Sequence, residues 1–203
     1  MSDQYKFQFD AANTSVLKMF EVERNKSKLQ KTAGSSFELE TGTNDMGVTG
    51  VVSVTQTKMS KGYAETSVFV DQDGNGIFEE AFEIEVATGL VPARKLEMHK
   101  FTLDVAGNVT ADYELRKGAW KLDRIDLDES YAQVSLDGVE YIVKTEQDRS
   151  GVEFELFRDD NLDGIWTKIA EGEAGLDYVD PVSGGIDLVG VQSYLETSAA
   201  VIG

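Results

Sequence analysis

The chain repeats itself, and this repetition limits what it can fold into more than any other feature of the sequence. Four blocks of the first half recur in the same order in the second half: 6–10, 20–29, 50–78 and 89–92 correspond to 100–104, 113–122, 138–166 and 175–181. Ordered recurrence at a slowly shrinking spacing indicates an internal duplication with small loop deletions. We therefore predict two units, residues 5–96 and 97–185, joined through residues 86–95 and followed by a tail, residues 186–203.

Within each unit, apolar and polar residues alternate, as they do in strands with one buried face. Phe20 and Val22 alternate with polar neighbours, and so do Phe154 and Leu156. Pairs such as Lys117-Gly118 are typical of hairpin turns, and no long stretch has helical spacing. The sequence predicts an all-β fold with two tandem, antiparallel units, each sandwich-like or barrel-like and each with one acidic hairpin loop. Whether the units are separate or share one continuous sheet is open at this point.

An aspartate-rich loop occupies the same place in each unit: DQDGNGIFEEAFE at residues 71–83 and DDNLDGIWTKIAE at residues 159–171. Side chains with oxygen atoms stand at the first, third and fifth places of both loops, and a glycine follows. Ca²⁺ prefers about six to eight oxygen ligands, which this spacing can direct at one centre, while the glycine permits the backbone reversal that brings in the seventh carbonyl. The candidate ligands are Asp71, Asp73, Asn75, Ile77, Glu79, Glu83, Asp159, Asn161, Asp163, Ile165, Thr167 and Glu171.

Ordinary turns are the alternative interpretation, because Asp, Asn and Gly also stabilise turns that bind no metal. Recurrence in both units favours calcium, since a turn needs an oxygen-bearing side chain at only one or two positions. In the first loop, four negative charges would also crowd together unless a cation neutralised them. They belong to Asp71, Asp73, Glu79 and Glu80. The sequence therefore predicts two Ca²⁺ sites, one in each unit.

The first half of each loop resembles the EF-hand-like calcium loop, with its Asp-x-Asp/Asn-x-Asp/Asn-Gly pattern, over about nine residues. An EF-hand has a bidentate Glu at the twelfth place, where this chain has Phe82 and Ala170. Because the flanks are strand-like, the loops are closer to the calcium hairpins of β-propeller and adhesin repeats, in which the ninth place is acidic. Glu79 fits that role and Thr167 offers a hydroxyl, while Glu83 and Glu171 are the remaining candidates to close the two shells.

Composition narrows the classes of partner. The chain has 37 Asp and Glu against 19 Lys and Arg, a formal net charge of −18, which disfavours nucleic acid and anionic membranes and favours divalent cations or basic partners. Cysteine is absent, which excludes disulfides, thiolate metal sites and a cysteine nucleophile. No apolar run is long enough to insert into a membrane, and the N-terminal segment lacks the apolar core of a secretory signal.

Motifs for catalysis or nucleotide binding are missing from the sequence. The single histidine, His99, lies near the predicted joint and is expected to be a satisfied or solvated linker residue. Trp120 and Trp166 could stack on sugar rings, but Trp166 follows its loop where Phe78 follows the other, so it is expected to anchor the loop to the core. Acidic residues are too abundant for the sequence to nominate a catalytic pair.

Acidic charge, absent cysteine, two incomplete calcium loops and the lack of an N-terminal signal make the chain similar to RTX-associated type I secreted bacterial proteins, which fold on meeting external calcium. The nonapeptide glycine repeats of that class are absent. The resemblance implies a non-catalytic extracellular or cell-surface module for adhesion, a surface layer or a matrix, with a surface protein or a polysaccharide as partner. The alternatives are a small secreted enzyme or carbohydrate-binding protein with structural calcium, and a cytoplasmic calcium buffer, which would need tighter sites.

Overall fold

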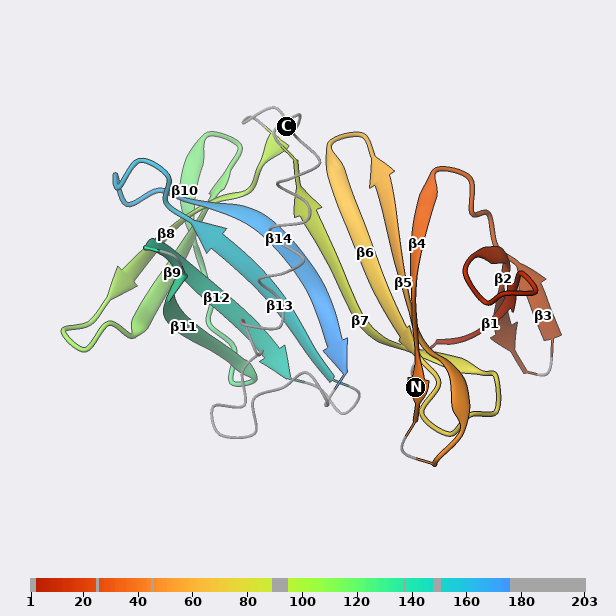
Figure 1. The fold of residues 1–203 in the computed structure, drawn as a ribbon. Coiled ribbons are helices and arrows are strands. Elements are labelled where there is room, and N and C mark those ends of the chain that lie inside the picture. The colour runs from red at the N-terminus through yellow and green to blue at the C-terminus, as the bar shows by residue number, and fades with distance from the viewer. Residues whose placement is uncertain are drawn as a thin grey trace. The chain divides into compact units, whose positions relative to one another are not determined.

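A computed structural model describes residues 3–24, 26–44, 46–88, 95–136, 138–147 and 151–175. These residues form fourteen β-strands and no α-helix (Figure 1), which confirms the predicted all-β class. They therefore contain no helix of the length and hydropathy that crossing a membrane requires. The predicted tail, and residues 89–94 of the predicted joint, lie outside the described ranges.

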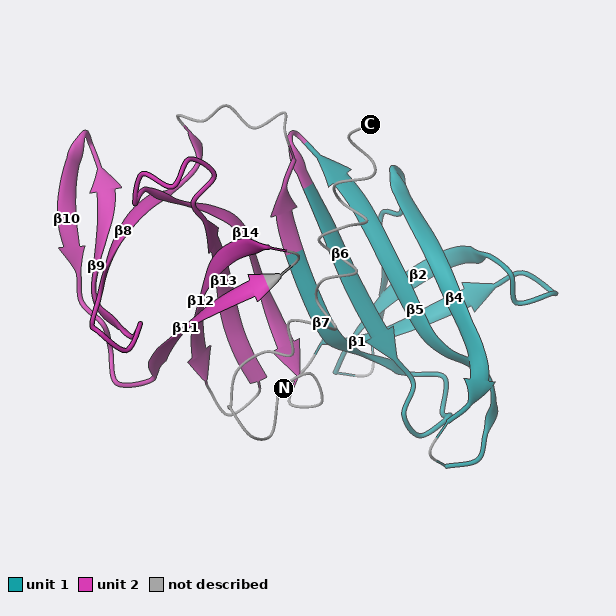
Figure 2. Ribbon diagram, turned by 60° about the vertical axis from the view of Figure 1, so that its left-hand side comes forward, with its two compact units in different colours: residues 1–60, 64–84 teal, residues 61–63, 85–203 magenta. Residues whose placement is uncertain are grey.

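The chain divides into two compact units, residues 1–60 with 64–84 and residues 61–63 with 85–203 (Figure 2). This division cuts through one strand, Phe78–Ala87, which the sequence repeat assigns entirely to the first unit.

The first seven strands form one sheet with the order β3-β2-β1-β7-β6-β5-β4. β1 meets β7 through only two residue pairs, Gln4 with Glu79 and Tyr5 with Phe78. Beyond this short pairing, which forms a corner of the sheet, residues of β1 and β2 pack against residues of β4, β5, β6 and β7 in a shared apolar core. The strand bounds are β1 (Gln4–Phe9), β2 (Val16–Glu23), β3 (Lys26–Leu29), β4 (Ser35–Thr43), β5 (Thr49–Ser60), β6 (Tyr63–Val70) and β7 (Phe78–Ala87).

The next seven strands have the same order, β10-β9-β8-β14-β13-β12-β11. β8 meets β14 through His99 with Trp166 and Met98 with Thr167, the positions that match the corner of the first unit. A duplicated chain predicts this equivalence; common descent of the two units stays a prediction. The strand bounds are β8 (Met98–Leu103), β9 (Val109–Arg116), β10 (Ala119–Asp123), β11 (Glu129–Leu136), β12 (Val139–Gln147), β13 (Gly151–Arg158) and β14 (Trp166–Gly175).

Residues with a left-handed backbone conformation form the turns of two hairpins. Lys117 and Gly118 have φ of 54° and 78° between β9 and β10, and Lys61 and Gly62 have φ of 37° and 102° between β5 and β6. Two consecutive positive φ values belong to the turn whose twist matches that of antiparallel strands. The sequence therefore fixes these hairpins locally, before any long-range pairing.

The core of the first unit combines both halves of its sheet. Met19, Val54, Phe69 and Phe78 are buried together. Phe7 from β1 meets Phe78 edge-on, with ring centroids 5.2 Å apart. The two parts of the sheet thus pack face to face, which agrees with the sandwich-like alternative. Barrel closure would need β3 to pair with β4, but within the described residues β3 pairs only with β2, and β4 only with β5.

The core of the second unit corrects one expectation. Ile142, Phe157 and Trp166 are buried there, which confirms the anchoring role expected of Trp166. His99 is not a linker residue: it lies within β8, is 4 % exposed, and packs between Phe101 and Phe157. The reason is its register, because His99 and Phe101 share the inward face of an alternating strand.

Candidate metal loops

Each aspartate-rich loop joins two neighbouring strands of its unit, and the second of these strands pairs with β1 or β8 at the corner of the sheet. The first loop connects β6 to β7 and the second connects β13 to β14. The residue that ends each loop, Phe78 or Trp166, is buried and begins the strand that pairs with β1 or β8. Burying an aromatic side chain stabilises a fold by about 1.5–3 kcal/mol, so each loop is held firmly at its C-terminal end.

In the first loop, the leading carboxylate binds the loop backbone. Asp71 is 6 % exposed, and its two oxygens accept hydrogen bonds from the N–H of Gly74 at 2.8 Å and of Gly76 at 3.0 Å. The Asp73 carboxylate accepts from the N–H of Asn75 at 3.1 Å, and the side-chain oxygen of Asn75 accepts from the N–H of Ile77 at 2.6 Å.

In the second loop, the leading carboxylate likewise binds the loop backbone. Asp159 accepts hydrogen bonds from the N–H of Gly164 at 2.8 Å, of Asn161 at 3.2 Å and of Asp163 at 3.3 Å. The Asp163 carboxylate accepts from the N–H of Ile165 at 2.9 Å. In both loops, therefore, the first side chain accepts a hydrogen bond from the N–H of the glycine at the sixth place. The fifth side chain accepts one from the N–H of the seventh residue.

The fourth place distinguishes the two loops. In the first loop it holds Gly74, with φ of +73°, and a Cβ built there would lie 2.6 Å from Cβ of Val48. In the second loop it holds Leu162, also left-handed at φ 55° and 85 % exposed. The glycine therefore lets the first loop lie against the turn that joins β4 to β5.

The eighth residue of each loop is its main apolar anchor. Ile77 and Ile165, at the seventh place, are half-buried, whereas the next residues, Phe78 and Trp166, are buried. This agrees with the anchoring role expected of Trp166.

The candidate closing groups lie in the strands. Glu79 is exposed in β7 and accepts a hydrogen bond from the Gln4 side chain at 3.2 Å. Thr167 pairs along its backbone with Met98 of β8 and Arg158 of β13. Neither residue belongs to the hydrogen-bonded skeleton of the loop.

Glu83 and Glu171 lie further along β7 and β14. Each stands five residues beyond the start of its strand, which at about 3.3 Å per residue is well removed from the loop. Glu171 forms an ion pair with Lys168 at 2.8 Å. The structure thus brings together the first, third, fifth and seventh residues of each loop, but not these distal carboxylates.

In both loops, side-chain oxygens accept hydrogen bonds from backbone N–H groups. Across the described residues, no three His, Asp or Glu side chains are arranged so that they could hold a metal ion. The skeleton by itself also suits an ordinary turn, so the calcium assignment stays a prediction.

A buried polar cluster in the second unit has no counterpart among the sequence predictions. His99 Nδ1 lies 2.8 Å from Oδ1 of Asp112, and the Tyr131 hydroxyl donates to Oδ2 of Asp112 at 3.4 Å. Asp112 is 0 % exposed, and His99 Nε2 is buried without a hydrogen-bond partner. Strand alternation could have placed His99 inward with Phe101, but no local signal identifies Asp112 as its partner.

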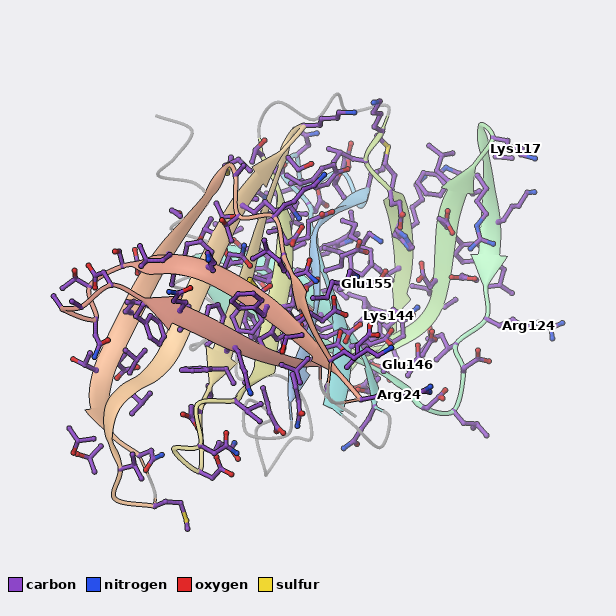
Figure 3. All side chains as sticks on the ribbon, turned by 90° about the vertical axis from the view of Figure 1, so that its right-hand side faces the viewer. Arg24, Lys117, Arg124, Lys144, Glu146 and Glu155 are labelled. Carbon is purple, nitrogen blue, oxygen red and sulfur yellow. The ribbon has the colours of Figure 1, made fainter. Side chains whose placement is uncertain are left out.

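Next to this cluster, two half-buried lysines organise the carboxylates of β11, β13 and β14. Lys168 contacts Glu97, Glu155 and Glu171 at 2.8–3.0 Å. Lys144 contacts Glu129 at 2.7 Å and lies 3.8 Å from Glu155, on the neighbouring strand (Figure 3). The two lysines thus offset part of the negative charge of four glutamates.

Comparison with protein-family models gave no match, and comparisons with curated proteins and with solved structures gave none either. The functional argument therefore depends on the chain's own residues.

Proposed function

We propose that the chain is a calcium-binding, non-catalytic β module in which each acidic loop binds one Ca²⁺. The observation that carries the proposal is the recurrence of one loop skeleton, with oxygen-bearing side chains at the first, third and fifth places, at equivalent corners of both units. A turn needs only one or two such side chains to cap its backbone, so the full set at both corners favours a hard cation.

The existing hydrogen bonds are compatible with a cation. An ionised carboxylate offers about four lone-pair positions, and Asp71 uses two for backbone N–H groups. Asp159 uses three, so each of the two carboxylates keeps at least one lone-pair position for a cation. Because these caps pre-form each loop, a cation would require adjustment mainly at Asp73, Asn75, Asn161 and Asp163.

Binding should be weak, because no distal carboxylate closes either shell. Affinities of about 10⁻⁴ to 10⁻³ M are typical of such extracellular modules. Sites of this strength would fill only where free calcium is millimolar. We therefore place the proposed role at the cell surface or outside the cell, in adhesion, a surface layer or a matrix, with export by a type I route.

Calorimetric titration tests the proposal most simply. We expect the protein to show two weak Ca²⁺-binding events, and Asp73→Ala and Asp163→Ala each to remove one of them. These two side chains are exposed, so their loss should leave the fold intact.

Asp104→Ala is the matched control. Asp104 also caps a turn, accepting from the N–H of Ala106 at 2.8 Å and of Asn108 at 2.9 Å, but it belongs to no acidic 1-3-5 set. It should retain both events. Equal loss of heat in all three variants, or no heat in the unmodified protein, would show that the loops are only turns.

A further inference from the structure

Among the residues that the structure describes, the first unit has two sheet edges without a neighbouring strand, and the two edges carry opposite charge. β3 is one edge and carries Lys26 and Lys28, whereas β4 is the other and carries Glu38 and Glu40. All four side chains are exposed. Residues 4–31 hold six Lys and Arg against three Asp and Glu, so the β3 side is locally positive in a chain of net charge −18.

The two edges also match in their alternation. In β3 the lysines alternate with Ser27 and Leu29, and in β4 the glutamates alternate with Phe37 and Leu39. Leu29 is 59 % exposed. If the two strands paired, the lysines would oppose the glutamates on one face, and Leu29 would meet Phe37 or Leu39 on the other, because alternate residues of a strand share a face.

Existing contacts leave the four charges available. Lys28 forms an ion pair with Glu21 at 3.4 Å, but 71 % of its side chain remains exposed. Glu40 accepts a hydrogen bond from the Ser53 hydroxyl at 3.0 Å, and this bond leaves further lone pairs on the carboxylate.

From these edges we infer that the partner of each is a second copy of this chain, with β3 of one copy pairing with β4 of the next. An unpaired edge is a ready template for another strand, and lysines usually guard it. Here the β4 edge of the same sheet is acidic. The lysines of β3 in one copy therefore attract the glutamates of β4 in the next copy. Since the two patches differ, the contact is head-to-tail and can join more than two copies, in an open chain or a closed ring.

The distant negative charge does not prevent this contact. At physiological ionic strength, charges beyond about 8 Å are largely screened, so the lysines and glutamates at the edges decide the interaction. The inference depends only on strand edges and is independent of whether the loops bind calcium.

Sedimentation velocity in a calcium chelator at physiological ionic strength tests the inference. The unmodified protein should show a weight-average sedimentation coefficient that rises with concentration. Lys26→Glu/Lys28→Glu makes both edges acidic, and Glu38→Lys/Glu40→Lys makes both basic. Each double variant alone should associate at least about tenfold more weakly, because like charges would then face each other.

Mixing the two double variants supplies the decisive result. The acidic β3 of one variant then fits the basic β4 of the other, so the mixture should recover the association that neither shows alone. Recovery also demonstrates that both variants are folded. Lys61→Glu/Lys117→Glu changes the net charge by the same amount at two hairpin turns outside β3 and β4, with Lys117 labelled in Figure 3, and should associate normally.

Three results would overturn the inference. The unmodified protein could stay monomeric up to about 1 mM, a concentration that reveals even weak contacts. The double variants could associate as strongly as the unmodified protein. The mixture could fail to associate although circular dichroism shows both variants folded.

Discussion

Three inward positions differ between the two units. His99, Asp112 and Tyr131 form a hydrogen-bonded cluster in the second unit. By strand register, Tyr5, Met19 and Phe37 occupy the matching positions of the first unit. The two sets occupy equivalent positions. Only the polar set of the second unit needs all of its hydrogen-bond partners, because an unpaired buried polar group costs about 1–3 kcal/mol.

Asp112→Ala should therefore lower the free energy of unfolding by about 1–3 kcal/mol, because His99 Nδ1 loses its buried acceptor. The triple exchange His99→Tyr/Asp112→Met/Tyr131→Phe, which installs the residues of the first unit, should be no less stable than the unmodified protein. Urea unfolding measures both. A triple variant less stable than Asp112→Ala would show that the two cores are not equivalent.

At the first loop, Gly74→Ala should destabilise the protein by about 1–3 kcal/mol, because the new methyl group meets Val48 and the backbone is left-handed. Gly76→Ala is the matched control: φ is +77°, but no atom lies within 4 Å of the new Cβ. It should cost less. Equal losses in urea unfolding would mean that backbone conformation alone matters at both places.

The sequence alone predicted the features of the fold that depend on residues close together in the chain. Alternation identified the strands, Lys117-Gly118 identified a hairpin, and the match of Trp166 to Phe78 identified a buried anchor. The linker role predicted for His99 is wrong because it rests on the position of the residue near the joint, whereas register with Phe101 in β8 places its side chain inward. The sequence could not identify Asp112 or the ion pairs of Lys168, because those partners lie on strands that only long-range pairing brings together.

At the scale of strands, β7 and β14 present opposite charges at one matching position. Lys168 in β14 forms ion pairs with three surrounding glutamates. Glu80 replaces it in β7. Burial raises the pKa of Glu80 to about 7; a hydrogen bond from Ser67 opposes this shift and the charge of Glu83 adds to it. In the first unit, Glu80 therefore binds a proton more readily in the folded state than in the unfolded state.

The folded-state pKa of Glu80 lies above its unfolded value, so protonation stabilises the folded state. This contribution is fully present below the unfolded pKa and is lost as pH rises through about 7. The melting temperature should therefore rise as pH falls from about 8 to 5, and Glu80→Gln should reduce that rise. An unchanged pH profile in Glu80→Gln would show that another group controls it.

For the whole molecule, calcium should act as a stabilising ligand. At free calcium about ten times the dissociation constant, each site adds about 1.4 kcal/mol to the free energy of unfolding. Two sites are then a substantial share of a total of about 5–15 kcal/mol. We expect the melting temperature to rise in millimolar CaCl₂ and to rise less in MgCl₂, because Mg²⁺ demands a regular octahedron and gives up water reluctantly. Equal effects of the two salts would indicate charge screening instead.

The most direct test is a calcium titration followed by the backbone amide resonances of the protein. The account predicts that the N–H signals of Gly76, Ile77, Gly164 and Ile165 shift together and saturate in the millimolar range, while signals of the Asp104 turn stay in place. Small shifts spread over all acidic segments, or none at the two glycines, would contradict it.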